Sequence, residues 1–402
     1  MPRVFVQSNQ TFDGPIKSQI SCSLLNGLVR NCFAQTIPSW RITHYGRGMG
    51  IIASPGLLTG WPTARPEDVG IAADLGSRLD HAFGRHEFAG LHGFLAVRHG
   101  MLAVERYYPG QDERWGTPLP DYAHGPALLH DVRSITKSIV GLLYGLALHA
   151  GQVPAASEKL ADAFPEYPHL KTDLLKRRIT IGHVLSMRMG LKWDESLAYD
   201  DPANAEIRME TSGDRVRFVL EQPMEMRPGA EWVYCGGATA LLGALIERGT
   251  GQRLEDFARE RLFAPMGIEA FEWVQGVDGR AAASSGLRLT ARDMARIGQM
   301  LLDRGSWNGR RIVPSSWITT SMKPRADVEA SLRYGYQWWL GQLASNGRPW
   351  YAAFGNGGQR LFAVPSLKIV VVIFAGNYNQ PDQWKMPIKL MSKIVIPSVR
   401  ER

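Results

Sequence analysis

The stretch L-H-D-V-R-S-I-T-K-S-I-V-G-L-L-Y-G-L-A-L-H-A-G, residues 129–151, decides how the chain folds. From Ser138 to Gly151 it contains no Asp, Glu, Lys or Arg, and apolar residues fill nearly every face of a helix. A helix that is apolar nearly all round belongs in a protein core. We therefore expect a central buried helix that begins near Ser134, with the other elements packed around it.

Ser134 and Lys137 stand at the polar start of this helix, three residues apart and hence on one face. A serine hydroxyl needs a base within hydrogen-bond reach to become a nucleophile. A lysine can be that base when it is neutral, and burial or a nearby positive charge favours the neutral form. Free N–H groups at a helix start suit an anionic transition state. The pair predicts a nucleophile and its base; the alternative is a capping serine beside a lysine that reaches solvent.

Composition narrows the class of protein. The chain has 402 residues, 45% hydrophobic and 21% charged, as in an ordinary globular enzyme. The net charge of +8 comes from scattered arginines without a basic stripe, which argues against nucleic-acid binding. No apolar run reaches the ~18 residues of a membrane-spanning helix. The cysteines form neither a disulfide framework nor paired metal-ligand spacing, so we expect no metal and no cofactor; they are Cys22, Cys32 and Cys235.

The N-terminal region carries a weak apolar run, residues 24–29, which Arg30 and Asn31 interrupt. It reads either as a poor export signal or as a start assigned too early. We expect residues 1–55 to be a poorly ordered extension and residues 56–402 to form the main domain. The compartment stays open, with a cytoplasmic location slightly favoured over export.

The elements around the central helix follow a simple order. A helix is expected over residues 72–85, and a hairpin over 94–97 and 102–107. Residues 108–128 read as a loop. Residues about 154–285 read as mostly helical, with a surface loop at 190–205. Further expected helices are 179–189 with Thr180 as its cap, 215–221, 238–248, 254–262 and 290–303 with Thr290 as its cap.

Strand patterns return near the C-terminus, at 334–340, 350–354, 359–364 and 368–375, before a final helix at 383–394. Strands at both ends and helices between them predict an α/β (α+β) fold. Its core is one antiparallel sheet of N- and C-terminal strands, flanked by helices and carrying a mostly helical insert. A cleft between sheet and insert is the expected place for a site.

The motif Ser134-Ile135-Thr136-Lys137-Ser138 resembles the nucleophile motif of the serine β-lactamase and penicillin-binding-protein superfamily. The nearest branch is the class C β-lactamase-like serine hydrolases, which includes esterases, D-amino-acid peptidases and 6-aminohexanoate-dimer hydrolases. The similarity runs from about residue 61 to residue 379, in the right order. The resemblance implies a β-lactamase/transpeptidase-like fold and a covalent acyl-enzyme on Ser134.

The second motif of that branch is a tyrosine followed by x-N, and here it reads Tyr234-Cys235-Gly236. The resemblance implies that Tyr234 relays the proton between Ser134, Lys137 and the leaving group. Gly236 replaces the usual asparagine, so the amide contact to the substrate is missing. A half-buried core tyrosine is the alternative.

The third motif, normally K-T-G or H-x-G, corresponds to Gly355-Asn356-Gly357 followed by Gly358. The cation or histidine is absent, which argues against β-lactamase and carboxylate-recognising peptidase activity. The resemblance implies an oxyanion hole formed by the N–H groups of Ser134 and Gly358, with Asn356 and Gly357 beside the substrate. A glycine-rich hairpin turn would account for the same residues.

Three further residues complete the candidates. Tyr199 could face the leaving group, as a loop tyrosine does in amide-hydrolysing relatives, or be an exposed loop residue. His130 and His183 read as structural residues, because nothing marks a histidine that reaches the serine in a triad. The sequence thus predicts a serine hydrolase for a small-molecule ester or amide. A β-lactamase, a D,D-peptidase and a non-catalytic acyl-binding protein stay open as alternatives, as does the oligomeric state.

Overall fold

The structure is a computed structural model that describes residues 61–120, 123–199, 201–329 and 331–400. The extension expected over residues 1–55 lies outside these described residues, so its order stays a prediction. Among the described residues, no helix combines the length and the apolar character needed to cross a membrane.

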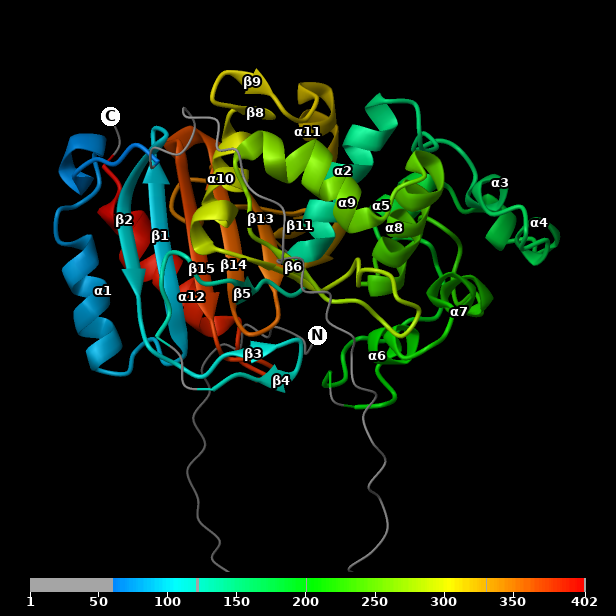
Figure 1. The fold of residues 1–402 in the computed structure, drawn as a ribbon, viewed down its shortest axis with the longest axis horizontal. Coiled ribbons are helices and arrows are strands. Elements are labelled where there is room, and N and C mark those ends of the chain that lie inside the picture. Colours follow the sequence, from blue (N-terminus) through cyan, green and yellow to red (C-terminus); the bar gives the residue numbers. More distant parts are fainter. Residues whose placement is uncertain (1–60, 121–122, 200, 330, 401–402) are drawn as a thin grey trace, which may run out of the picture.

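An antiparallel sheet of eight strands forms one end of the molecule, in the order β10-β11-β12-β13-β14-β15-β1-β2 (Figure 1). The N-terminal hairpin joins the C-terminal strands where β1 pairs with β15, for example Phe94 with Ile373. Every residue of β1 and β15 is buried, as expected for apolar strands covered on both faces. The strands are β1 Leu91–Arg98, β2 Met101–Tyr107, β10 Ala326–Glu329, β11 Leu332–Tyr334, β12 Trp339–Gln342, β13 Pro349–Gly355, β14 Gln359–Val364 and β15 Ile369–Ala375.

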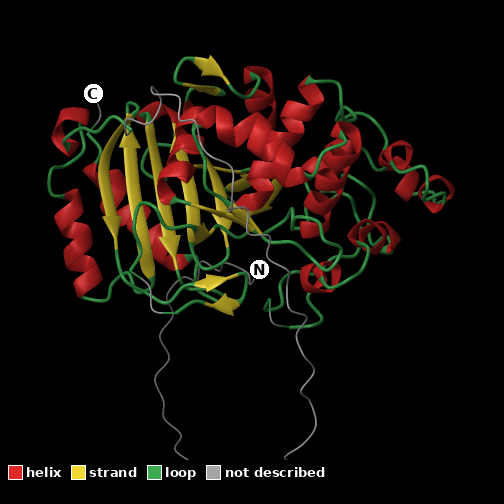
Figure 2. Cartoon of the chain, viewed as in Figure 1, coloured by secondary structure: helices red, strands yellow, loops and turns green. Residues whose placement is uncertain are grey.

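Helices cover both faces of the sheet (Figure 2). α10 (Ala291–Leu302) packs across β1, β14 and β15, and α12 (Lys385–Leu390) lies behind the sheet in Figure 1. α1 (Leu75–Gly84) packs against the edge strand β2. The expected cap of α10 is confirmed, because the Thr290 hydroxyl accepts a hydrogen bond from the Asp293 N–H at 3.1 Å.

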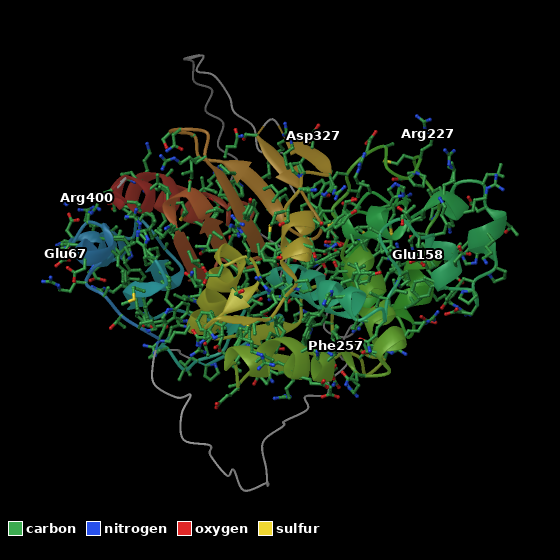
Figure 3. All side chains as sticks on the ribbon, turned by 90° about the horizontal axis from the view of Figure 1, so that it is seen from above. Glu67, Glu158, Arg227, Phe257, Asp327 and Arg400 are labelled. Carbon is green, nitrogen blue, oxygen red and sulfur yellow. The ribbon has the colours of Figure 1, made fainter. Side chains whose placement is uncertain are left out.

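Most of the segment between β2 and β10 forms the other end of the molecule, where helices predominate among the regular elements; α10 belongs to the same segment but packs on the sheet. Figure 3 shows the two ends from above, with Glu67 and Arg400 at the sheet end and Glu158 and Arg227 at the helical end. The central helix α2 packs on α8 inside this region. The helices are α2 Ile135–His149, α3 Leu160–Ala163, α4 His169–Thr172, α5 Ile181–Leu185, α6 Ala205–Glu210, α7 Arg215–Glu221, α8 Gly236–Thr250, α9 Leu254–Ala258 and α11 Ser315–Ser321.

Short strands lie between the sheet end and the helical end of the molecule. They form three small sheets of their own, and a π-helical turn extends both α9 and α12. The expected fold, an antiparallel sheet built from both chain ends with flanking helices and a helical insert, is confirmed. The short strands are β3 Glu113–Arg114, β4 Thr117–Pro118, β5 His130–Asp131, β6 Glu272–Trp273, β7 Leu287–Leu289, β8 Ser306–Trp307 and β9 Arg310–Arg311.

The continuous strand expected over residues 334–340 is wrong. The chain breaks between β11 and β12, where buried Gln337 adopts φ of 65°. Its amide side chain donates to the Leu185 carbonyl at 3.0 Å and accepts from the Thr239 hydroxyl at 2.8 Å. The break brings the chain against α2, because a Cβ added at Gly141 would lie 2.9 Å from the Cβ of Gln337. This tertiary contact overrides the local strand pattern.

Candidate active site

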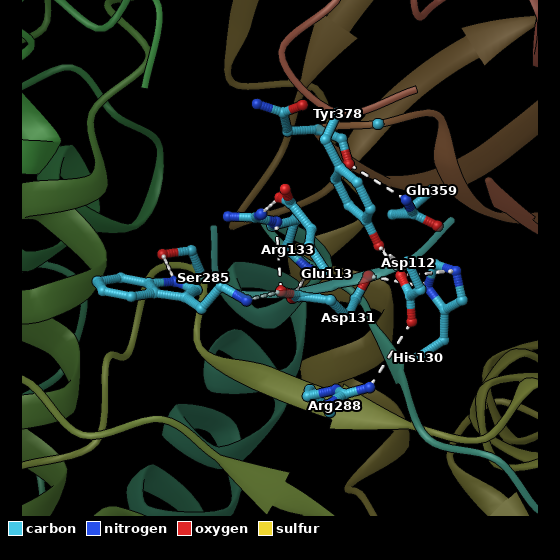
Figure 4. Close-up of polar contacts among 12 residues, drawn as sticks. Asp112, Glu113, His130, Asp131, Arg133, Ser285, Arg288, Gln359 and Tyr378 are labelled. Carbon is cyan, nitrogen blue, oxygen red and sulfur yellow. Dashed lines mark hydrogen bonds and ion pairs between the residues drawn. The ribbon is translucent and has the colours of Figure 1, made fainter. Parts of the chain in front are cut away.

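The nucleophile turn, residues 131–134, joins β5 to the start of α2. Arg133 has φ of 50°, a left-handed conformation that is uncommon for a residue with a side chain. The Asp131 carboxylate holds the turn by accepting hydrogen bonds from the N–H groups of Arg133 at 3.2 Å and Trp115 at 2.7 Å (Figure 4). Ser134 therefore stands at the N-cap of α2, where the helix leaves backbone N–H groups without intrahelical partners.

The other hydroxyls of the motif are used for packing. The Thr136 hydroxyl donates to the Arg133 carbonyl at 2.6 Å. The Ser138 hydroxyl donates to the Gln337 carbonyl at 2.6 Å, which ties α2 to the break in the sheet. These two bonds fix the first turn of the helix, whereas the Ser134 hydroxyl faces the lysine.

Lys137 is buried, with 1% of its surface exposed, and its amine contacts three oxygen groups. Nζ lies 3.0 Å from Ser134 Oγ, 3.1 Å from the Ser284 carbonyl oxygen and 3.5 Å from a carboxylate oxygen of Glu206. An ammonium donates three hydrogen bonds and so matches three acceptors. The spacing of serine and lysine thus produces the expected contact.

The expectation that Lys137 is neutral is wrong in this structure. Burial lowers the pKa of Lys137, but the Glu206 carboxylate, followed by Tyr234 and Glu195, outweighs burial and raises that pKa above its usual value. A positive charge beside the lysine would favour its neutral form, whereas the structure places the Glu206 carboxylate there. Lys137 is therefore an ammonium in the resting site.

Tyr234 lies in the segment just before α8 and is half-buried. Its ring centroid is 4.8 Å from Lys137 Nζ, so the ring lies beside the serine–lysine pair. Burial raises the pKa of Tyr234 more than the Lys137 ammonium lowers it, so the resting group is a neutral phenol. The structure brings Ser134, Lys137 and Tyr234 together, as the sequence predicts.

Glu195 and Glu206 belong to the site and were not predicted from the sequence: Glu195 lies in the expected surface loop 190–205, and Glu206 directly follows it. Glu195 is 8% exposed and Glu206 is 1% exposed. Glu206 lies in the first turn of α6, whose N-cap Asn204 accepts a hydrogen bond from the Glu206 N–H at 2.9 Å. The one signal in the sequence is indirect, because a buried lysine requires an anion, but it does not say which one.

Tyr199 is half-buried rather than solvent-exposed. Burial, then Glu206, Glu195 and Tyr234, raise the pKa of its phenol. The Tyr199 phenol thus lies within the electrostatic range of the two buried carboxyl groups. Its contact with a leaving group stays a prediction.

The glycine-rich turn, residues 356–358, connects β13 to β14. Gly355 makes the close approach to the nucleophile turn, since a Cβ added there would lie 2.4 Å from the Val132 carbonyl oxygen. A Cβ at Gly358 would instead face Ala375 at 3.2 Å. The oxyanion role of Gly358 stays a prediction.

The other two residues of this turn have partners of their own. The Asn356 amide donates to the Asn379 side chain and accepts from its N–H, both at 2.8 Å. The Gly357 N–H donates to the Gln383 side chain. The substrate contacts expected of Asn356 and Gly357 stay predictions, and these bonds fit the alternative of a structural hairpin turn.

His92, His124 and His130 form the one group among the described residues whose ligand atoms could hold a metal ion, within 4.8 Å of one another. The rings of His92 and His124 are stacked, with centroids 4.0 Å apart and planes 19° apart. Lone pairs in parallel rings do not converge on one ion. His92 Nδ1 and His130 Nε2 already share a hydrogen bond of 3.0 Å, so we read the cluster as structural support behind the nucleophile turn.

A cavity of about 670 Å³ is separate from this site. It lies between α7, α8 and the segment that precedes β7. Ser134, Lys137 and Tyr234 do not line it. The chemistry is therefore located by the side-chain contacts and not by cavity size.

Curated relatives with similar sequences are hydrolases. The chain is 25% identical over 376 residues to "6-aminohexanoate-dimer hydrolase" of Paenarthrobacter ureafaciens, covering 86% of this chain and 89% of that protein. It is 26% identical over 229 residues to "Esterase EstB" of Burkholderia gladioli, covering 55% of this chain and 56% of that one. These relatives support a general hydrolase role.

A solved structure shows the same fold as this chain. The octameric penicillin-binding protein homologue from Pyrococcus abyssi superposes with a TM-score of 0.61 at 16% identity, covering 80% of this chain and 78% of that chain. The family model described as "Beta-lactamase" matches residues 82–384, which include Ser134, Lys137 and Tyr234. The chain therefore belongs to the beta-lactamase family.

Proposed function

We propose that this chain is a serine hydrolase that cleaves an ester or amide bond through a covalent acyl-enzyme on Ser134. The observation that carries the proposal is the contact of 3.0 Å between Ser134 Oγ and Lys137 Nζ, beside the phenol of Tyr234. A serine needs such acid–base partners within hydrogen-bond reach.

The reaction follows from this geometry. Ser134 Oγ bonds to the substrate carbonyl carbon while its proton passes to the Lys137–Tyr234 pair, which releases one of its own protons in the same step because both groups are protonated at rest. The anionic oxygen of the intermediate is stabilised by the N–H groups of Ser134 and Gly358, and each such donor typically contributes ~3 kcal/mol. Tyr234 then protonates the leaving alkoxide or amine, and water attacks the acyl-serine by the same path in reverse.

The substrate class follows from the relatives and from the third motif. The relatives are named for an aminohexanoate dimer and for ester hydrolysis, so a small ester or linear amide is the proposed substrate. A β-lactamase or D,D-peptidase is less well supported, because Gly355 stands where the family motif has a cation or histidine, and the next residue, Asn356, is bonded to Asn379.

Labelling with a fluorophosphonate probe tests the nucleophile. Wild type should be labelled on Ser134, and Ser134→Ala should not be labelled. Ser138→Ala is the matched control from the same motif and should keep its label, since its hydroxyl is used in packing. Labelling of Ser134→Ala equal to wild type would reject the proposal.

A substrate panel then separates the alternatives. We expect turnover of a short p-nitrophenyl ester or of a linear 6-aminohexanoate dimer, lost in Ser134→Ala. Fast turnover of a cephalosporin without ester hydrolysis would favour the β-lactamase. A stable acyl-serine without turnover of any substrate would favour a non-catalytic acyl-binding protein.

A further inference from the structure

A buried carboxyl pair, Glu206 and Glu195, lies directly behind Lys137. Glu206 accepts hydrogen bonds from the Ser284 hydroxyl at 2.6 Å and the Ser285 hydroxyl at 2.8 Å, while it faces the Lys137 amine at 3.5 Å. Burial raises the pKa of Glu206, but the lysine and these hydroxyls lower it below its usual value. Glu206 is therefore the ionised counter-ion of the lysine.

Glu195 is the protonated member of the pair. Burial and the neighbouring Glu206 raise the pKa of Glu195 to about 8. Its side chain lies beside Glu206 at Gly236 and accepts from the Trp193 indole at 2.6 Å. Two carboxylates in contact rarely ionise together, so one anion and one acid form a stable arrangement beside one ammonium.

Gly236 makes room for this pair. A Cβ added at Gly236 would lie 2.9 Å from a carboxyl oxygen of Glu195 and 3.0 Å from the carboxyl carbon of Glu206. The Gly236 N–H also donates to Glu195. The space for a side chain at position 236, where the family motif carries asparagine, is thus filled by two carboxyl groups from another part of the chain.

The ammonium state of Lys137 raises a question of proton balance. An ammonium cannot accept the serine proton unless it gives one up in the same step. The Glu206 carboxylate is the anion in contact with it. Lys137 can therefore take the proton from Ser134 Oγ while one of its own protons moves to a Glu206 oxygen. This leaves an ammonium, a neutral Glu206 acid and one negative charge on the substrate oxygen.

We propose that Glu206, seated in the space left by Gly236, is the positioning residue that sets the charge of Lys137 and receives its proton during acylation. The proton returns through Lys137 and Tyr234 to the leaving group, so the cycle balances. Glu206 does not touch the substrate and acts through Lys137. This inference rests on the proposed function and adds its proton acceptor.

The pH dependence of labelling tests the inference. In wild type the acid limit should follow protonation of Glu206, whose pKa is lowered, so the labelling rate stays flat down to about pH 5. In Glu206→Gln the amine is the sole acceptor and must be neutral, and a buried lysine has a pKa of about 5–6 or higher. The acid limb should therefore move up by about one pH unit or more.

Three further variants distinguish proton acceptance by Glu206 from a purely structural role of this residue. Glu206→Asp keeps a carboxylate and should restore the wild-type limb. Ser284→Ala removes one donor to Glu206 and should shift the limb upward by less, which keeps the test open if Glu206→Gln does not fold. Glu210→Gln is the matched control, because Glu210 ends the same helix, is equally buried and shares the Ser284 hydroxyl, but it pairs with Arg215 at 2.7 Å and not with Lys137. It should lose stability without moving the limb.

Outcomes for the two proposals differ. Wild type without Ser134-dependent labelling would reject the proposed function and this inference with it. Ser134-dependent labelling whose acid limb is the same in wild type, Glu206→Gln and Ser284→Ala would overturn this inference alone. A limb that moves equally in Glu210→Gln would also overturn it.

Discussion

Two clusters of titratable groups adjoin the nucleophile turn. One contains ionised groups, and the other is neutral. On the helical side, the lysine cluster (Lys137, Glu206 and Glu195) keeps an ion pair. On the sheet side, the histidine cluster (His92, His124 and His130) is neutral. Burial is the first cause that lowers the pKa of all three imidazoles, to about 2 for His92. Burial also lowers the pKa of Lys137, yet that group stays charged.

The two clusters have a carboxyl group at the same distance, and the difference lies in how that group is shared with other partners. Lys137 has a carboxylate at 3.5 Å that hydroxyl groups further stabilise. The nearest carboxylate to the histidine cluster, Asp112, is 3.5 Å from His130, but the Tyr378 phenol at 2.8 Å and the Arg288 guanidinium at 3.7 Å also contact it (Figure 4). Other cations and donors thus share that anion, and an imidazole gains less from it. The partner, and not burial alone, decides the charge of a buried base.

Removal of the lysine is the strongest way to break this contrast. Lys137→Met leaves the Glu206 carboxylate buried without its cation, and breaking a buried ion pair typically costs about 3–5 kcal/mol. Activity should fall by about 10²–10⁴, the usual contribution of a general acid–base group. Urea unfolding and ester hydrolysis measure the two effects.

The double variant Lys137→Met/Glu206→Gln is the control for this experiment. It removes the unpaired charge, so most of the stability should return while activity does not. If the double variant has the same free energy of unfolding as the single variant, the charge of Lys137 does not depend on its ion pair with Glu206.

The two clusters also differ in how the free energy of unfolding changes with pH. His92 is neutral when folded and protonates near pH 6.5 when unfolded, so its contribution is present above pH 6.5 and is lost as pH falls toward about 2. Glu195 is protonated when folded up to about pH 8 and ionises near 4.5 when unfolded, so its contribution is lost as pH rises through this interval.

Between pH 5.5 and 7.5 the two groups therefore act in opposite directions. His92→Asn should lower the slope of unfolding free energy against pH, and Glu195→Gln should raise it. Each change is at most about 1.4 kcal/mol per pH unit, the value for one proton. Urea titrations at several pH values give the slopes, and changes of the same sign in both variants would contradict this account.

The same contrast explains what the sequence could predict. Ser134 and Lys137 were predicted from their spacing at the start of an unusually apolar helix, and Tyr234 was predicted from the resemblance of Tyr234-Cys235-Gly236 to a family motif. Glu195 was not predicted, because residues 190–205 contain several acidic side chains and read as a solvated loop, and Glu206 directly follows that loop. Selection of Glu206 and Glu195 depends on contacts with Lys137 and Gly236, which lie far away in sequence.

The sheet shows a similar limit. β13, β14 and β15 follow from apolar runs between turn residues, and their expected bounds differ from the observed ones by a residue or so. The break at Gln337 was missed, because the side-chain bonds to Leu185 and Thr239 that stabilise its left-handed backbone come from the helical region. Local patterns predict elements, and long-range contacts decide their interruptions.

Two glycines give the smallest and sharpest comparison, since each makes room for one cluster. A Cβ at Gly110 would lie 2.3 Å from Nε2 of the buried His92 ring, whereas a Cβ at Gly236 would lie 2.9 Å from a Glu195 oxygen. A rigid, enclosed ring yields less than a carboxyl group on a flexible stem. Gly110→Ala should therefore cost about 1–3 kcal/mol, as overpacking does, and Gly236→Ala less.

Gly84→Ala is the control, because nothing lies within 4 Å of its added Cβ and alanine favours the helix. Urea unfolding should rank the three variants in stability as Gly84→Ala, then Gly236→Ala, then Gly110→Ala. If Gly236→Ala were the most destabilised, the carboxyl pair would be held as rigidly as the imidazole. Glu206 could then not exchange a proton with Lys137 through small movements of its side chain.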